Sequence, residues 1–158
     1  MIKKLTVSIP ILIAIIVSVV ITTVMINNKD EDPNFSLEKN QLNRIIEHIK
    51  SEYGANPEFL WPDRYPVCAI FRHGDNRKWF ALIGTIKSKS LGIEEDKEIE
   101  IINLKFDKGQ ALDFAESNEH IFPAYHMNKY NWITIILDDS LGDNAIFELI
   151  KKSYLLTA

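Results

Sequence analysis

The spacing of apolar residues divides the chain into one long apolar run followed by a body of shorter, alternating segments. Leu5–Ile26 contains no charged side chain over 22 positions. A helix of that length rises about 33 Å, enough to cross a hydrocarbon core of about 30 Å. Pro10 lies within the run and is tolerated in membrane-spanning helices. The pattern therefore predicts a transmembrane anchor over residues 1–28.

Two other interpretations of the apolar run stay open. A cleaved signal peptide also begins with basic residues, but its apolar region spans about 7–15 residues and ends at a small-residue cleavage site. Here the run is longer and ends Val24-Met25-Ile26-Asn27-Asn28, without an Ala-x-Ala pattern. A buried core helix is the third interpretation. The length of the run favours an uncleaved anchor over both.

Basic residues beside the run predict the side of the membrane on which the body lies. Lys3 and Lys4 precede the run, whereas Lys29 is followed by three acidic residues at 30–32. Lys and Arg are enriched on the cytoplasmic side of membrane spans, so this small excess favours an extracytoplasmic body. A cytoplasmic body is expected instead if the protein binds DNA.

After a polar linker at residues 29–35, the periodicity predicts one domain over residues 36–158. Its first element is an amphipathic helix over residues 37–53, with Ser36 as the cap and Gly54 as the stop. The apolar positions of this helix recur at helical spacing, at Leu42, Ile45, Ile46, Ile49 and Tyr53.

Four further segments have the composition of strands, and two have that of helices. The strands are predicted at Val67–His73, Lys78–Ile86, Glu98–Leu104 and Trp132–Leu137. Gly74–Arg77 between the first two predicts a hairpin, and residues 87–97 read as a polar loop. One helix is predicted from a cap at Asp107 to about Asn118, and the last over Ile146–Tyr154. The order α-β-β-β-α-β-α is typical of an α+β fold with helices on an antiparallel sheet.

Composition narrows the functional classes. Outside residues 1–28 the chain carries 16 basic and 22 acidic side chains, a net charge of −6. Nucleic-acid-binding domains usually have a basic face, so this net charge argues against a protein that binds nucleic acid through its overall charge. The single Cys68 excludes an internal disulfide and is expected to pack as a small core residue. The four histidines have no paired metal-ligand spacing, and the chain has no nucleophile elbow or phosphate loop. We therefore predict a non-enzymatic module without metal or cofactor.

One segment is more distinctive: Pro123-Ala124-Tyr125-His126-Met127-Asn128-Lys129-Tyr130-Asn131-Trp132-Ile133-Thr134. It resembles the signature of the MmcQ/YjbR family, small bacterial proteins described as DNA-binding-like. Lys78–Ile83, Asn103–Lys105 with Asp107, and Ser153-Tyr154 with Leu156-Thr157 are similar to other parts of the family, so the resemblance covers residues 36–158. It implies a frataxin-like (CyaY-like) twisted antiparallel sheet backed by helices. It also implies a DNA-binding role, assigned by fold analogy, and the anchor departs from a family of mostly soluble proteins.

The signature contains the first group of candidate binding residues. His126, Asn128 and Lys129 come just before a predicted strand, which Trp132 opens, so a rigid frame can present them from a loop. They can meet an anionic ligand there. The alternative is that Asn128 turns the chain, His126 bonds locally and Trp132 packs.

The second group lies on and beside the predicted hairpin, where Asp75 is the one acidic residue among residues 72–89. It consists of Arg72, Arg77, Lys78, Lys87 and Lys89, with Trp79 nearby. These residues can form a wing that contacts phosphates. The alternative is a solvated edge, whose charge prevents pairing with other sheets. The sequence thus predicts DNA or another anionic ligand as the partner. For an extracytoplasmic body, the alternative partner is a protein or an envelope component.

Overall fold

The computed structural model describes residues 40–158. The predicted anchor at 5–26, the linker at 29–35 and the predicted cap Ser36 lie outside the described residues. Among the helices of residues 40–158, none is both long enough and apolar enough to cross a membrane.

The described residues form three α-helices, one 3₁₀ helix and five strands. The helices are α3 (Gln41–Tyr53), α4 (Ala111–Glu116) and α5 (Asp143–Thr157), and the 3₁₀ helix η1 is Ser88–Leu91. The strands are β1 (Ala69–Arg72), β2 (Trp79–Lys87), β3 (Glu98–Lys105), β4 (Ile121–Pro123) and β5 (Trp132–Ile136). The sequence did not predict β4, whose three residues are too few to show a periodicity, or η1, which lies within the stretch predicted as a polar loop.

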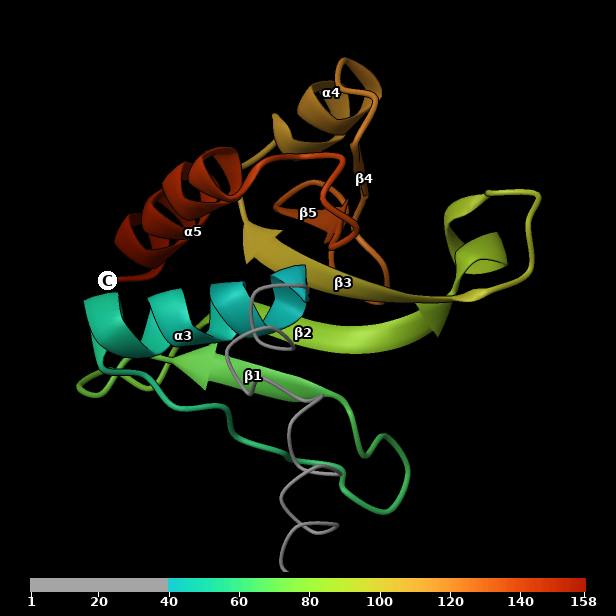
Figure 1. The fold of residues 1–158 in the computed structure, drawn as a ribbon. Coiled ribbons are helices and arrows are strands. Elements are labelled where there is room, and N and C mark those ends of the chain that lie inside the picture. The colour runs from blue at the N-terminus through green and yellow to red at the C-terminus, as the bar shows by residue number, and fades with distance from the viewer. Residues whose placement is uncertain (1–39) are drawn as a thin grey trace, which may run out of the picture. The chain divides into compact units, whose positions relative to one another are not determined.

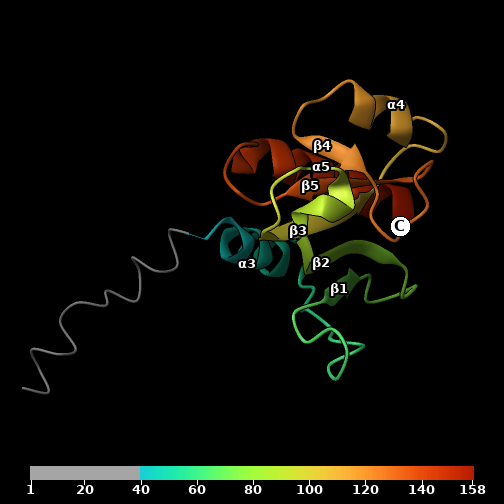
Figure 2. The same ribbon diagram turned by 90° about the vertical axis from the view of Figure 1, so that its right-hand side faces the viewer.

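The five strands form one antiparallel sheet in the order β1-β2-β3-β5-β4, which confirms the α+β prediction. Figures 1 and 2 show the twist of this sheet and the position of α3 and α5 beside each other along it. The predicted β1–β2 hairpin is confirmed. It is closed by the His73 N–H, which donates to the Lys78 carbonyl at 3.0 Å, and Arg77 in its turn has a φ of 61°.

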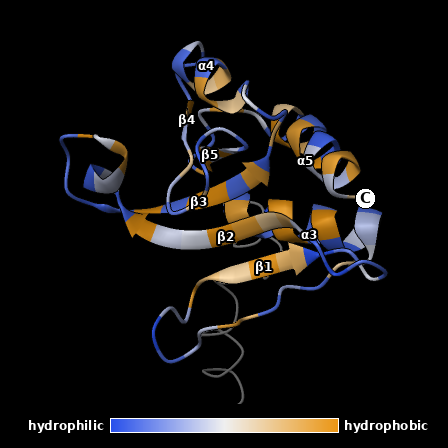
Figure 3. Cartoon of the chain, turned by 180° about the vertical axis from the view of Figure 1, so that it is seen from behind, coloured by the Kyte–Doolittle hydropathy of each residue, from blue (hydrophilic) through white to orange (hydrophobic). Residues whose placement is uncertain are grey.

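One face of the sheet carries the helices and the main core. Apolar residues of α3 and α5 belong to this core. Figure 3 colours the hydrophobic stretches of the helices and strands orange. Phe80 lies at the centre, with its ring 5.7 Å from that of Tyr53 and 5.1 Å from that of Tyr154. The fully buried residues around it include Ile45, Ile49, Phe71, Ile102, Leu104, Ile133, Ile135, Ile146 and Ile150.

Polar contacts join the start of α3 to the turn before α5. Asn40, rather than Ser36, is the N-cap of α3, since its Oδ1 accepts the Leu42 N–H at 2.8 Å. Arg44 Nε lies 2.6 Å from Asp143 Oδ2, and its guanidinium also pairs with Asp139. The hydrogen bond from Arg44 lowers the pKa of the Asp143 carboxyl. The predicted stop at Gly54 is confirmed by its left-handed φ of 63°.

The prediction that Asp107 caps a helix is wrong. The N-cap of α4 is Gln110, and the Asp107 carboxylate instead lies 2.5 Å from Lys152 Nζ on α5. The helix is consequently shorter than predicted and ends at Glu116. The ends of the four predicted strands lie within two residues of the predicted ones, and β3 and β5 begin at the predicted residue.

Candidate functional site

The sheet face opposite the helices is only partly covered and contains a groove of about 560 Å³. Pockets for small ligands usually have volumes of about 300–1,000 Å³. Two cross-strand pairs of β2 and β3, Leu82 with Asn103 and Gly84 with Ile101, supply its floor. Residues from 61–68 line one part of the groove and residues 125–127 another.

Gly84 leaves space in the floor of the groove. It is buried within β2, where a glycine weakens a strand and often marks a place at which another group approaches closely. A Cβ at position 84 would lie 3.8 Å from Cβ and Sγ of Cys68, an ordinary contact distance. The backbone therefore does not require glycine here, and the missing side chain enlarges the groove.

Cys68 lines the groove, so the prediction that it is a core residue is wrong. Ala69 and Phe71 of β1 face the helices, and strand alternation turns Ile70 to the opposite face, the face to which Cys68 is also exposed in part. Burial raises the pKa of the Cys68 thiol. The thiol therefore stays protonated at neutral pH and is a weak nucleophile.

Two buried polar residues, Asn103 and Thr134, hold residues 125–127 in the groove. Tyr125 donates its N–H to Thr134 Oγ1 at 2.9 Å, and its carbonyl accepts from Asn103 Nδ2 at 3.3 Å. Thr134 Oγ1 also donates to Asn103 Oδ1. Because both backbone polar groups of Tyr125 are satisfied in this way, the position of His126 is fixed. His126 has a left-handed φ of 56°, and its ring lies 4.0 Å from that of Tyr125.

The other residues of the predicted signature site have different surroundings. Asn128 turns the chain, because its Oδ1 accepts the Tyr130 N–H at 2.9 Å. Lys129 is exposed and makes no hydrogen bond or ion pair within residues 40–158. Trp132 is 8% exposed, and Lys105 Nζ lies 5.4 Å from its ring centre. Of the four predicted residues in this signature, only His126 lines the groove.

Of the residues of the predicted hairpin site, some lie at the groove and others lie away from it. Trp79 lines the groove and makes an edge contact with Trp61, with 6.0 Å between the ring centres. Arg72 lies 5.8 Å above the Trp79 ring, and its Nε is 3.1 Å from a Glu58 carboxylate oxygen. Arg77 also pairs with Glu58, at 3.0 Å. The two arginines therefore share one carboxylate, which reduces the positive charge of the predicted wing.

Lys78 lies at the hairpin turn and not in the groove. Its Nζ approaches the carbonyl of Ala158 at 3.4 Å, while its N–H donates to Asn76 Oδ1 at 2.9 Å. Arg77 is likewise absent from the groove lining. The structure thus brings Trp79 and His126 to one groove, with Arg72 beside Trp79, and leaves Arg77, Lys78, Asn128, Lys129 and Trp132 outside it.

The segment before β1 supplies a wall of the groove and was not predicted as part of a site. This segment exposes five large apolar side chains: Phe59 (52%), Leu60 (39%), Trp61 (40%), Tyr65 (46%) and Val67 (55%). Exposed apolar patches mark interaction surfaces. In the sequence, this wall of the groove is visible as a cluster of aromatic and apolar residues between prolines. The cluster has neither the period of a strand nor that of a helix, so it predicts no element.

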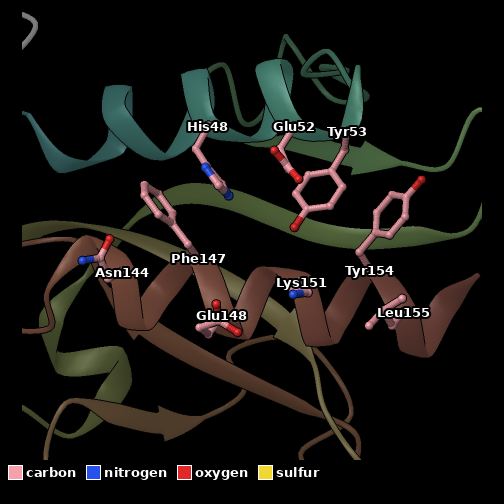
Figure 4. A pocket seen from close by; sticks show the side chains of 9 residues that line it. All are labelled: His48, Glu52, Tyr53, Asn144, Phe147, Glu148, Lys151, Tyr154 and Leu155. Atoms are coloured by element: carbon pink, nitrogen blue, oxygen red, sulfur yellow. The ribbon is translucent and has the colours of Figure 1, made fainter.

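A second cleft lies between α3 and α5 (Figure 4), with a volume of about 640 Å³. The His48 ring stacks on Phe147 at 3.6 Å, and the Tyr53 and Tyr154 rings stack at 4.5 Å. These contacts belong to the packing of the two helices. Glu52 and Glu148 line the cleft with one lysine, Lys151, so its acidic groups are in excess and it suits an anionic ligand less well than the groove on the sheet. Within residues 40–158, no three His, Cys, Asp or Glu side chains are placed to bind a metal ion.

Comparisons with known proteins agree on one family. The YjbR family profile matches residues 50–156. The chain is 38% identical to the uncharacterized protein YyaQ of Bacillus subtilis (strain 168) over 113 residues, which are 72% of this chain and 94% of YyaQ. It is 34% identical to the uncharacterized protein YjbR of Escherichia coli (strain K12) over 61 residues, covering 37% of this chain and 52% of that one.

Solved structures have the same fold. A crystal structure of a Pseudomonas syringae protein, 37% identical, superposes with a TM-score of 0.69 and covers 73% of this chain and 97% of that one. A Deinococcus radiodurans protein with a DUF419 domain has a TM-score of 0.51 at 23% identity, over 70% of this chain and 76% of that one. The second likeness concerns the fold alone.

Proposed function

Because the chain belongs to the YjbR family, for which the signature implies a DNA-binding-like role, we propose that it is a non-enzymatic module that binds DNA or another anionic ligand in the groove. The lining of the groove is the observation that supports this most. It contains aromatic side chains, the cationic Lys87 and the imidazole of His126, but no carboxylate. That composition is notable in a body with an excess of acidic residues.

The chemistry of the groove favours binding over catalysis. The raised pKa of the Cys68 thiol makes it a weak nucleophile. His126 is the lining group of the type that most often acts as a general base, and the lining holds no Asp or Glu to orient its ring. The predicted hairpin wing has a smaller part in this proposal than in the sequence-based hypothesis, because Glu58 partly neutralises Arg72 and Arg77. Of the predicted site residues outside the groove, Lys129 is best suited to meet a phosphate, because it is exposed and makes no ion pair within residues 40–158.

A mobility-shift assay over a salt series tests the proposal. The fragment 36–158 is suitable, since the matched region makes up 97% of a Pseudomonas syringae protein whose structure was solved. DNA should shift at low ionic strength and be released as salt rises, because phosphate contacts release counterions. Absence of any salt-dependent shift at low ionic strength would contradict DNA binding.

We also propose that residues 5–26 hold the body at a membrane, on the grounds of their length and lack of charge. The Lys bias before the run favours an extracytoplasmic body, where the partner would be a protein or an envelope component. A reporter that is active on only one side of the membrane, fused after Ala158, separates the two functions. A cytoplasmic signal supports DNA as the partner, and an extracytoplasmic signal contradicts binding to chromosomal DNA.

A further inference from the structure

We infer that the groove holds an unpaired nucleobase, so that the protein binds single-stranded nucleic acid in preference to a duplex. This inference rests on the proposed function and specifies the form of nucleic acid that the groove takes.

Aromatic side chains of the groove support this choice. Trp61, Tyr65, Trp79 and Tyr125 all line it, and Trp61 and Tyr65 stay 40% and 46% exposed. Aromatic rings bind single strands by stacking on bases, and they tolerate different sequences because every base has a flat π-face. In a duplex both faces of each base are already stacked on neighbouring pairs. Only an unpaired base can therefore use these rings.

The floor of the groove has room for a flat group. Gly84 presents no side chain in the middle of β2, although its conformation would accept one. The neighbouring floor residues Leu82 and Ile101 are apolar, which suits the face or edge of a base. Thr85 and Ser90 also line the groove and offer hydroxyl groups to the polar edge of a base.

The charges of the groove suit a short stretch of strand. Lys87 and His126 are the lining groups that can meet phosphates, and no carboxylate lines the groove itself. Lys87 is exposed and pairs with Glu98 at 3.5 Å, a solvent-exposed ion pair that a phosphate can replace. Single strands lose affinity with salt by a slope of about −0.7 for each phosphate neutralised by a Lys or Arg, so Lys87 alone predicts a slope near −0.7. Duplex contact through Arg72, Arg77, Lys78 and Lys129 would instead give a slope of about −3.6, at about −0.9 for each contact.

Fluorescence anisotropy on fragment 36–158 tests the inference, with a labelled 12-nucleotide single strand and the duplex of the same sequence as probes. The single strand should bind at least tenfold more tightly than the duplex. Trp61→Ala should weaken single-strand binding by about tenfold, the usual effect of removing one stacking ring. The matched control is Phe59→Ala, which removes an exposed aromatic of the same segment that does not line the groove, and should leave binding unchanged.

Gly84→Val tests the floor, because the valine would fill the space in the groove. The variant should keep or raise the melting temperature, since a β-branched residue suits a strand, and should lose more than tenfold in single-strand affinity. Gly84→Ala adds only a Cβ at ordinary contact distance and should have a smaller effect. If Gly84→Val unfolds the fragment, the Trp61→Ala and Phe59→Ala pair decides the result.

Four outcomes would overturn the inference. Equal binding of strand and duplex, or unchanged binding by folded Gly84→Val, would contradict it while leaving the proposed function standing. A mononucleotide that binds as tightly as the strand would make a free nucleotide the occupant. Absence of binding to every nucleic acid would refute the proposed function as well, and vesicle binding that depends on Trp61 would then point to a membrane surface.

Discussion

The two faces of the sheet differ in what covers them and in which side chains they present. The helix-bearing face buries aromatic and aliphatic side chains, with Phe80, Ile45 and Ile133 fully inaccessible. The opposite face combines a groove, half-exposed tryptophan and tyrosine rings, and the buried polar pair Asn103 and Thr134. The first face is packed for stability. The second keeps apolar surface exposed to water, and binding of a ligand would bury that surface.

Different interactions hold the segments that cover the two faces. Helices with regular apolar spacing cover the first face, so secondary structure and packing reinforce each other. On the second face, hydrogen bonds to the backbone of Tyr125 hold a loop over the strands. Substitutions on the first face should therefore change stability, and most substitutions in the groove should change binding.

Phe80→Ala should have the largest effect on stability. Its side chain is fully buried, with the rings of Phe71, His73 and Tyr154 within 6.4 Å. Removing it leaves a cavity and should cost about 3–5 kcal/mol in a urea titration. Phe59→Ala, at a position 52% exposed, should change the free energy of unfolding by less than about 0.5 kcal/mol. Equal losses in both variants would refute the assignment of Phe80 to the core that stabilises the helix-bearing face.

Thr134→Val should have the next largest effect, since the valine has a similar shape but no hydroxyl. The Tyr125 N–H then lacks its acceptor and Asn103 lacks a partner. We expect a loss of about 1–3 kcal/mol in the free energy of unfolding. Thr85→Val is the matched control, because Thr85 lies on β2 in the groove lining and makes no side-chain hydrogen bond within residues 40–158. A neutral Thr134→Val would mean that this network does not hold the loop.

Asp143→Asn should show a smaller effect that depends on pH. The Arg44 hydrogen bond keeps the folded-state pKa of Asp143 below its ordinary value of 3.8. The stabilisation is therefore fully present above about pH 4 and is lost as pH falls through the lower folded-state pKa. Wild type should exceed Asp143→Asn by about 1 kcal/mol at pH 7, and the difference should shrink toward pH 2. A difference that grew toward low pH would contradict the sign of this pKa shift.

Lys129→Ala should have the smallest effect on stability, within about 0.5 kcal/mol, because the side chain is exposed and unpaired within residues 40–158. If Lys129 contacts a phosphate, the variant should bind DNA more weakly and lower the magnitude of the salt slope by about 1. Anisotropy across a salt series measures both quantities. A stability loss above about 1 kcal/mol would instead give Lys129 a structural role.

The sequence predicted the covered face well because that face depends on long periodic segments. The spacing of Ile45 and Ile49 placed α3, and the turn at 74–77 placed the β1–β2 hairpin. The anionic-site prediction selected Trp79 and His126, which do line the groove, but it could not show that Arg72 and Arg77 share Glu58. That carboxylate lies 14 residues before Arg72 in a segment without periodicity.

The groove itself was less predictable for two physical reasons. Its wall at residues 61–68 has no regular secondary structure. The strand β4, which precedes the lining residues 125–127, has only three residues. The assignment of Cys68 to the core failed because residues of a strand alternate between faces, so a continuous apolar run does not reveal which face each residue occupies. Only the tertiary structure brings these segments together.

The most direct test of the groove as the binding site is an amide NMR titration of fragment 36–158 with a short single strand. We expect the largest shift changes at Gly84, Asn103 and residues 125–127, with changes in the indole N–H signals of Trp61 and Trp79, since these residues line the groove. Changes confined to Arg77, Lys78 and Lys129, with the groove signals unmoved, would contradict this account.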